Sequence, residues 1–175
     1  MGLTANGVTI LGTFCSVIAA MLLIPNGHLF AACLAITGFV LFDLLDGTMA
    51  RLSEQGTNKW GALLDSTLDR ISDAAILGSL LWYLEKNNQT LSGVVLINVL
   101  LGFLISYIKA KAESLDIECN GGLAERTERL IITLVAIGLA GIGFSVFLVI
   151  GMWILLIASL VTVAQRFQIV YKASK

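Results

Sequence analysis

The sequence predicts an all-α integral membrane protein, a bundle of six transmembrane helices around a polar cavity. Its composition supports this class, because 57% of the 175 residues are hydrophobic, only 13% are charged and the mean hydropathy is +0.90. Apolar stretches near the roughly 20 residues that a spanning helix needs recur along the chain. Backbone groups in lipid must bond internally, so each stretch is expected to be helical.

The expected spans are residues 7–24, 29–45, 61–84, 91–108, 130–143 and 144–167. Both termini then lie on one side, together with the connections 47–60 and 109–129. Of the 11 Lys and Arg residues, only Lys86 falls on the other side. The positive-inside rule therefore predicts a plasma membrane protein whose cavity faces the cytoplasm. No linker divides the chain, so residues 1–175 are expected to form a single domain.

The net charge of −1 excludes a generally basic surface of the kind that binds nucleic acid. Anion binding must therefore depend on local clusters of basic residues. The polar residues are not spread evenly, and most of the aspartates lie between Asp43 and Asp73.

Two pairs of aspartates interrupt this apolar sequence. Asp43 and Asp46 are three residues apart, and Asp65 and Asp69 are four apart, so each pair lies on one face of a helix. The short connection 47–60 lets the second helix fold back beside the first, which brings the four carboxylates together. Their mutual repulsion predicts a site for one or two magnesium or manganese ions, which prefer carboxylate oxygen.

A second interpretation is a buried ion-pair network, in which Arg51 and Arg70 balance the aspartates in a cation transporter. That reading explains neither the glycines of the stretch nor its Ala-Arg pair. Asp73, one turn beyond Asp69, is expected to pair with a nearby arginine or with a metal-bound water.

The central stretch has the pattern D-x2-D-G-x2-A-R, then nine residues, then G-x3-D-x3-D. It resembles the signature of the CDP-alcohol phosphotransferase family, although one extra residue stands near Asn58 or Lys59. The resemblance implies a membrane enzyme that transfers a substituted phosphate from a CDP-linked lipid to an alcohol and releases CMP.

The resemblance also implies a role for each motif residue. Asp43, Asp46, Asp65 and Asp69 would hold two Mg²⁺ or Mn²⁺ ions, and Asp69 would also accept the proton of the acceptor hydroxyl. Near the start of the chain, Asn6 and Thr9 are similar to the family's Asn-x-x-Thr segment, which contacts cytidine. The residues implied to bind the donor nucleotide are Asn6, Thr9, Gly47, Ala50, Arg51, Thr57 and Gly61.

A cationic pocket for the acceptor is expected at the inner helix ends, where Ser106, Lys109, Arg126 and Arg166 fall. Such a pocket suits a phosphate-bearing acceptor, whereas the alternative interpretation is ordinary flanking charge. The segments ISDAAILGSLLWYL, SYIKAKAESL, GLAERTERLI and VTVAQR look like the actinobacterial phosphatidylinositol phosphate synthase group of this family. In that group the corresponding basic residues bind the phosphate of inositol 1-phosphate.

The expected reaction therefore joins CDP-diacylglycerol and inositol 1-phosphate to give phosphatidylinositol phosphate and CMP. A first alternative keeps the chemistry and uses glycerol 3-phosphate, as in a phosphatidylglycerophosphate synthase. A second alternative is the carboxylate-lined cation transporter, which would move ions without releasing CMP. An ether-lipid donor also stays open, and the family analogy implies a homodimer.

Overall fold

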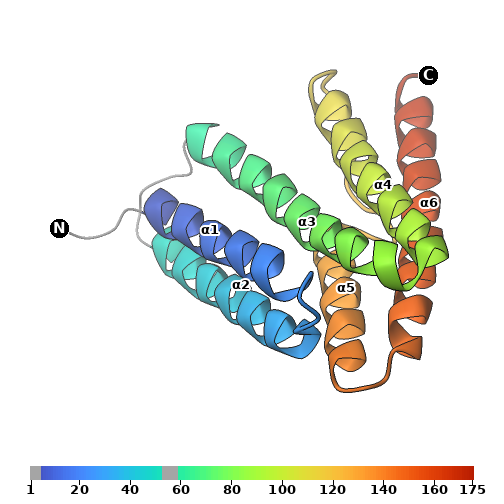
Figure 1. Cartoon of the computed structure of the whole chain (residues 1–175). Coiled ribbons are helices and arrows are strands. Elements are labelled where there is room, and N and C mark those ends of the chain that lie inside the picture. Colours follow the sequence, from blue (N-terminus) through green and yellow to red (C-terminus); the bar gives the residue numbers. More distant parts are fainter. Residues whose placement is uncertain (1–4, 53–58) are drawn as a thin grey trace.

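The computed structural model describes the backbone of residues 5–52 and 59–175 and the side chains of residues 7, 9–42 and 59–175. This part of the chain is helical throughout, apart from turns and one longer connection (Figure 1). The helices are α1 (Ala5–Leu23), α2 (Leu29–Leu52), α3 (Lys59–Asn87), α4 (Gln89–Glu113), α5 (Arg126–Gly141) and α6 (Val146–Ala173). The predicted all-α, six-helix architecture is confirmed.

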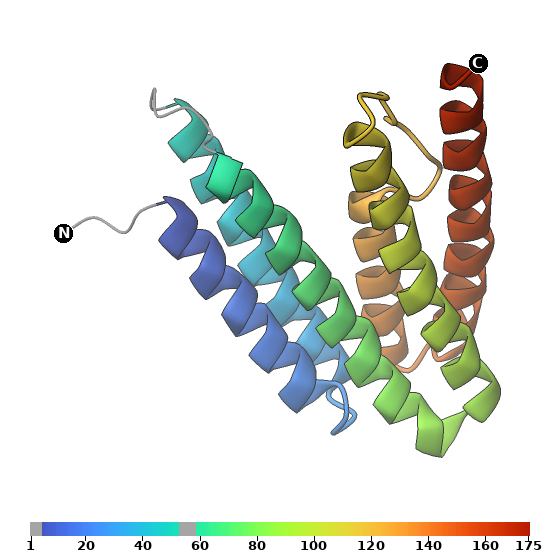
Figure 2. The same cartoon turned by 90° about the horizontal axis from the view of Figure 1, so that it is seen from above.

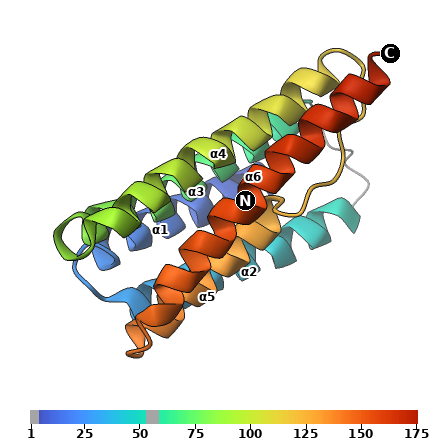
Figure 3. The same ribbon diagram turned by 90° about the vertical axis from the view of Figure 1, so that its right-hand side faces the viewer.

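The helices pack as a ring in which each has two principal neighbours. Helix α1 packs against α2 and α3, α4 packs against α3 and α6, and α5 packs against α2 and α6. Figure 3 shows α5 and α6 on the side of the ring away from α1 and α3. Buried apolar side chains from every helix form the core, among them Ile36, Leu80, Val95, Ile137 and Met152.

Most charged residues of the chain lie toward one end of the bundle, here called the polar end. The first residues of α1, α3 and α5 and the last residues of α2, α4 and α6 lie at this end, and the short turns lie opposite. Toward the polar end the ribbons of α1 to α3 diverge from those of α4 and α6 (Figure 2). A contact between α3 and α5 at this end therefore crosses the ring.

Small residues let the helices approach closely at the opposite end. A Cβ added at Gly138 would lie 2.9 Å from Cys33 Sγ, and one at Gly141 would overlap the backbone of Phe30. These glycines allow α5 to lie directly on α2, as small residues do at membrane helix interfaces.

Two predicted boundaries were wrong. The connection expected at 47–60 is shorter, because α2 continues to Leu52 and α3 begins at Lys59. Hydrophobicity falls at the first aspartates, but the following Met, Ala, Arg and Leu residues favour helix. The last two helices do not divide between 143 and 144: α5 ends at Gly141 and α6 begins at Val146.

Within the described residues, α4 and α6 are long and apolar enough to cross a membrane. Shorter apolar helices are Thr9–Leu23 and Leu29–Phe42, whereas α5 has only 16 residues and α3 begins with a charged segment. Large apolar side chains also face outward, such as Leu100 (60% exposed) and Ile157 (61%). Outward apolar surface of this extent is expected where lipid surrounds a protein.

Candidate active site

The three aspartates of α3 lie toward the polar end, one helical turn apart. Asp65 is exposed, whereas Asp69 and Asp73 are half-buried. Asp43 and Asp46 lie in α2, but their side chains fall outside the described residues. Among the side chains that are described, no three His, Cys, Asp or Glu residues gather. The all-carboxylate ligand set still fits a hard divalent cation, so the four-aspartate metal site stays a prediction.

Most predicted donor residues also fall outside the described side chains. Asn6 lies in α1 and Gly47, Ala50 and Arg51 lie in α2, where only the backbone is described, and Thr57 lies between the described segments. Thr9 and Gly61 are described and half-buried, in the first two turns of α1 and α3. These two residues therefore lie at the polar end, as predicted, and the donor roles stay predictions.

Arg126, the first residue of α5, reaches across the ring to the last motif aspartate. Its Nη2 lies 2.9 Å from Asp69 Oδ1, and its side chain is 32% exposed. A charge-assisted contact of this length is among the stronger polar interactions. The structure thus places a predicted phosphate-binding cation directly beside the predicted proton acceptor.

A second arginine of α5 pairs with the next carboxylate. Arg129 Nη2 lies 3.2 Å from Asp73 Oδ2, and the expected arginine partner of Asp73 is thereby confirmed. The sequence interpretation counted Arg129 only as a positive charge on the inner side. Arg126 and Arg129 are three residues apart, and Asp69 and Asp73 are four apart. One arginine of α5 can therefore face each carboxylate of α3 across the ring. That spacing was the available signal.

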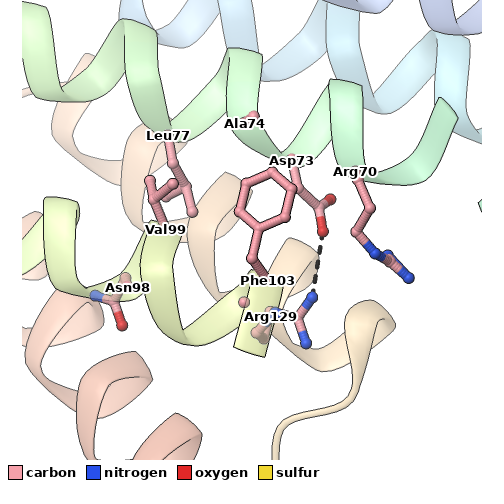
Figure 4. Close-up of a pocket in the computed structure, with 9 residues that line it drawn as sticks. Arg70, Asp73, Ala74, Leu77, Asn98, Val99, Phe103 and Arg129 are labelled. Carbon is pink, nitrogen blue, oxygen red and sulfur yellow. Dashed lines mark hydrogen bonds and ion pairs between the residues drawn. The ribbon is translucent and has the colours of Figure 1, made fainter. Parts of the chain in front are cut away.

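A small cavity of about 20 Å³ lies beside this pair, between α3, α4 and α5 (Figure 4). Leu77, Val99 and Phe103 provide its apolar wall. Asn98 also lines it; its Nδ2 donates to Met152 O at 3.0 Å, and within the described part of the chain its buried Oδ1 has no hydrogen-bond partner. A cavity of this size holds about one water.

Arg166 on α6 is buried, with only 4% of its side chain exposed. Its Nη1 donates to Ile105 O at 2.6 Å, its Nε donates to Gly121 O at 3.3 Å, and its Nη2 lies 3.6 Å from Glu125 Oε1. The guanidinium therefore joins α4 and the connection before α5 to α6. Phosphate binding by Arg166 stays a prediction, and it requires exchange of the Glu125 contact.

Two more α6 residues, which the sequence interpretation missed, hold the same connection. Thr162 Oγ1 accepts from Ala124 N at 2.8 Å, and Gln165 Oε1 accepts from Leu123 N at 3.1 Å. Gly122 has a φ of +144°, and a Cβ there would lie 2.5 Å from Thr162 Cγ2. Only glycine suits this conformation and this close approach. Helix α6 thereby fixes the segment that leads into Arg126.

The other two predicted acceptor residues come from the last turns of α4. Ser106 Oγ donates to Gly102 O at 3.0 Å, and Lys109 Nζ lies 3.9 Å from Glu113 Oε1. Arg166 contacts the carbonyl that precedes Ser106 and the carboxylate that precedes Arg126. The predicted acceptor residues are thus gathered at one end of the bundle, while their joint use by a phosphate stays a prediction.

Comparison with known proteins was made for both sequence and structure. Two curated relatives are phosphatidylinositol phosphate synthases: that of Mycobacteroides abscessus is 48% identical over 94% of this chain and 76% of its own length, and that of Mycobacterium bovis is 45% identical over 98% and 81%. The crystal structure of the Mycobacterium tuberculosis phosphatidylinositol phosphate synthase with CDP-DAG bound matches 97% of this chain and 87% of its own, with 44% identity and a TM-score of 0.91.

A further crystal structure of the tuberculosis enzyme holds manganese and citrate, and it also matches with a TM-score of 0.91 over 97% of this chain and 83% of its own. The family model for CDP-alcohol phosphatidyltransferase matches residues 2–164, which include every motif residue named above. This confirms the family that the aspartate motif indicated. The chain belongs to the CDP-alcohol phosphatidyltransferase family.

Proposed function

We propose that this chain transfers the phosphatidyl group of CDP-diacylglycerol to inositol 1-phosphate, giving phosphatidylinositol phosphate and CMP. The observation that carries this proposal is the 2.9 Å contact between Arg126 and Asp69. It puts a guanidinium, which suits a phosphate, beside the carboxylate that the family motif assigns as proton acceptor. Relatives up to 48% identical that are phosphatidylinositol phosphate synthases support the same acceptor.

In the proposed reaction the acceptor hydroxyl oxygen forms a bond to the phosphorus that carries the diacylglycerol. The bond from that phosphorus to the bridging oxygen breaks, and CMP leaves with the bond electrons. Asp69 takes the hydroxyl proton, because it is the motif carboxylate next to Arg126. Arg126 holds the acceptor phosphate, which keeps the hydroxyl within reach of Asp69.

Asp43, Asp46, Asp65 and Asp69 are proposed to hold two Mg²⁺ or Mn²⁺ ions, which when bound offset the diphosphate charge. The manganese in a 44% identical structure supports a divalent cation of this kind. The donor nucleotide is proposed to contact Asn6, Thr9, Gly47, Ala50, Arg51, Thr57 and Gly61. The donor's acyl chains stay in the bilayer, where the outward apolar side chains of the bundle lie.

The polar end of the bundle is proposed to face the cytoplasm. Lys and Arg flank this end, whereas Lys86 in the last turn of α3 is the one Lys or Arg of the described residues at the other. The homodimer is retained as a proposal from the family analogy, and no single surface of the described residues is assigned to it.

The first test is CMP release by the purified protein in lipid vesicles with CDP-diacylglycerol and Mg²⁺. Inositol 1-phosphate, glycerol 3-phosphate, free inositol and serine are compared as acceptors. Turnover with inositol 1-phosphate supports the proposal. Turnover with glycerol 3-phosphate alone keeps the mechanism and replaces the acceptor, and cation flux without CMP release supports the transporter alternative instead.

Asp69→Asn tests the assignment of the base in the same assay. The amide has nearly the same shape but cannot accept the proton, so CMP release is expected to fall by about 10²- to 10⁴-fold. Asp116→Asn, an identical change at an exposed carboxylate in the connection before α5, is the matched control. Substantial turnover by Asp69→Asn would rule out this residue as the base.

A further inference from the structure

Asp73 is not part of the family motif, yet it contacts both arginines of α5. Its Oδ2 lies 3.2 Å from Arg129 Nη2, and its Oδ1 lies 3.7 Å from Arg126 Nε. Figure 4 shows Arg129 extending from α5 toward Asp73 on α3. One carboxylate thus links the arginine at the reaction site to a second arginine deeper in the bundle.

The Arg129 side of this link is fixed. The Arg129 side chain is 9% exposed, and its Nη1 donates to Ala124 O at 3.3 Å. The guanidinium packs beside Gly102 of α4, where a Cβ would make ordinary van der Waals contact with Arg129 Nε at 3.7 Å. A buried guanidinium must keep a charged partner, because an unpaired buried charge is strongly unfavourable. Arg129 therefore holds the Asp73 carboxylate in place.

Arg126 has two carboxylates within reach, but one of them has other tasks. Its Nη2 contacts Asp69, and its buried Nε faces Asp73 and has no hydrogen-bond partner among the described residues. Under the proposed function, Asp69 uses its oxygens for a metal ion and for the acceptor proton. Asp73 has no such task, so it is the partner that Arg126 can keep throughout the reaction.

We infer that Asp73, held by Arg129, is a positioning residue that keeps the Arg126 guanidinium directed at the acceptor phosphate when Asp69 gives up its own contact. This inference rests on the proposed function. It deepens that proposal by assigning acceptor affinity to a pair of residues that do not touch the acceptor.

Asp73→Asn tests the inference in vesicles with saturating CDP-diacylglycerol and varied inositol 1-phosphate. The amide keeps the shape and removes the charge, so the acceptor KM is expected to rise by about tenfold. The donor KM is expected to stay within about twofold, because Arg126 is proposed to hold the acceptor and not the donor, and kcat is expected to fall by less than the acceptor KM rises. Asp116→Asn serves as the matched control and leaves all three constants unchanged.

A double variant decides whether Asp73 acts through Arg126. In an Arg126→Ala background, Asp73→Asn is expected to add no further rise in acceptor KM, because the residue that it positions is absent. Asp73→Glu, which keeps the charge, is expected to recover part of the acceptor affinity. Additive effects in the double variant, or an equal loss of donor and acceptor binding in the single one, would overturn the inference.

Arg129→Lys provides a second variant if Asp73→Asn does not fold. It keeps the buried charge but loses the planar arrangement of donors, so a smaller rise in acceptor KM is expected, with the donor KM again unchanged. Failure of the wild type to use any phosphate-bearing acceptor would refute the proposed function itself. Wild-type turnover with inositol 1-phosphate, together with unchanged KM in both variants, would refute this inference alone.

Discussion

Two arginines at the polar end of the bundle, Arg126 and Arg166, are both predicted to bind the acceptor phosphate, but they lie in different surroundings. Arg166 is 4% exposed; it donates to two backbone carbonyls at 2.6 and 3.3 Å, and its contact with the Glu125 carboxylate is longer, at 3.6 Å. Arg126 is 32% exposed, and its partners are the carboxylates of Asp69 and Asp73. A backbone carbonyl is held in place by the main chain, whereas a carboxylate side chain can exchange one cation for another.

This difference separates a guanidinium that stabilises the fold from one that is free to change partners. Arg166 holds the segment that carries Arg126, and Arg126 faces Asp69, the carboxylate proposed as the base. We therefore expect loss of Arg166 to lower mainly the stability of the fold, and loss of Arg126 to weaken mainly acceptor binding. Three substitutions test that division, and they are taken in order of decreasing effect.

Arg166→Ala is expected to have the largest effect, a loss of about 3–5 kcal/mol in the free energy of unfolding. It removes the buried charge and its bonds to the Ile105 and Gly121 carbonyls, and thereby frees the connection before α5 from α4. Denaturant unfolding in detergent measures the loss, and donor and acceptor binding should both weaken. Arg166→Lys is the control: it keeps the charge but not the planar set of donors, so it should recover part of the free energy of unfolding that Arg166→Ala loses. Selective loss of acceptor binding at unchanged stability would contradict this division.

Arg126→Ala is expected to act mainly on the acceptor. A hydrogen bond to a charged group contributes about 1.5–3 kcal/mol, so the KM for inositol 1-phosphate should rise by about 10- to 100-fold. The free energy of unfolding should change by less than about 1 kcal/mol, since the Arg126 side chain is one-third exposed. Once the arginine is absent, the Asp69 carboxylate can also turn toward water. Acceptor titrations with CMP release as the readout, beside unfolding of the same preparation, give both numbers. An equal rise in the donor KM would count against an acceptor pocket at Arg126.

How much of this could be predicted from the sequence differs between the same two regions. The aspartate spacing, the helical class and Arg126 were all visible, because periodicity and motif are local properties. The contacts of Arg166, Thr162 and Gln165 were not, because they join α6 to a connection about 40 residues earlier. Sequence reasoning therefore indicated which residues lie at the polar end and missed the α6 contacts that hold the connection before α5.

The Asp73–Arg129 pair lies between these extremes. Asp73 could be expected to meet a nearby arginine, but the sequence did not indicate which one. Packing of α3 across the ring from α5 makes the choice, and that depends on the tertiary arrangement of all six helices. The extent of α2 was underestimated for a related reason, because a helix that ends in a polar site does not end where its apolar residues do.

Lys109→Ala is expected to have the smallest effect of the three substitutions. The Lys109 side chain is 39% exposed, and Nζ lies 3.9 Å from Glu113 Oε1, so the pair contributes at most about 0.5 kcal/mol to stability. If Lys109 faces the acceptor phosphate, its loss should raise the acceptor KM by about fivefold, which corresponds to about 1 kcal/mol.

Glu113→Ala is the matched control, because it breaks the same ion pair and keeps the lysine. That variant should leave the acceptor KM unchanged or lower it, since Lys109 loses a competing anion. A rise of similar size in both variants would mean that Lys109 acts through the end of α4 and does not contact the phosphate.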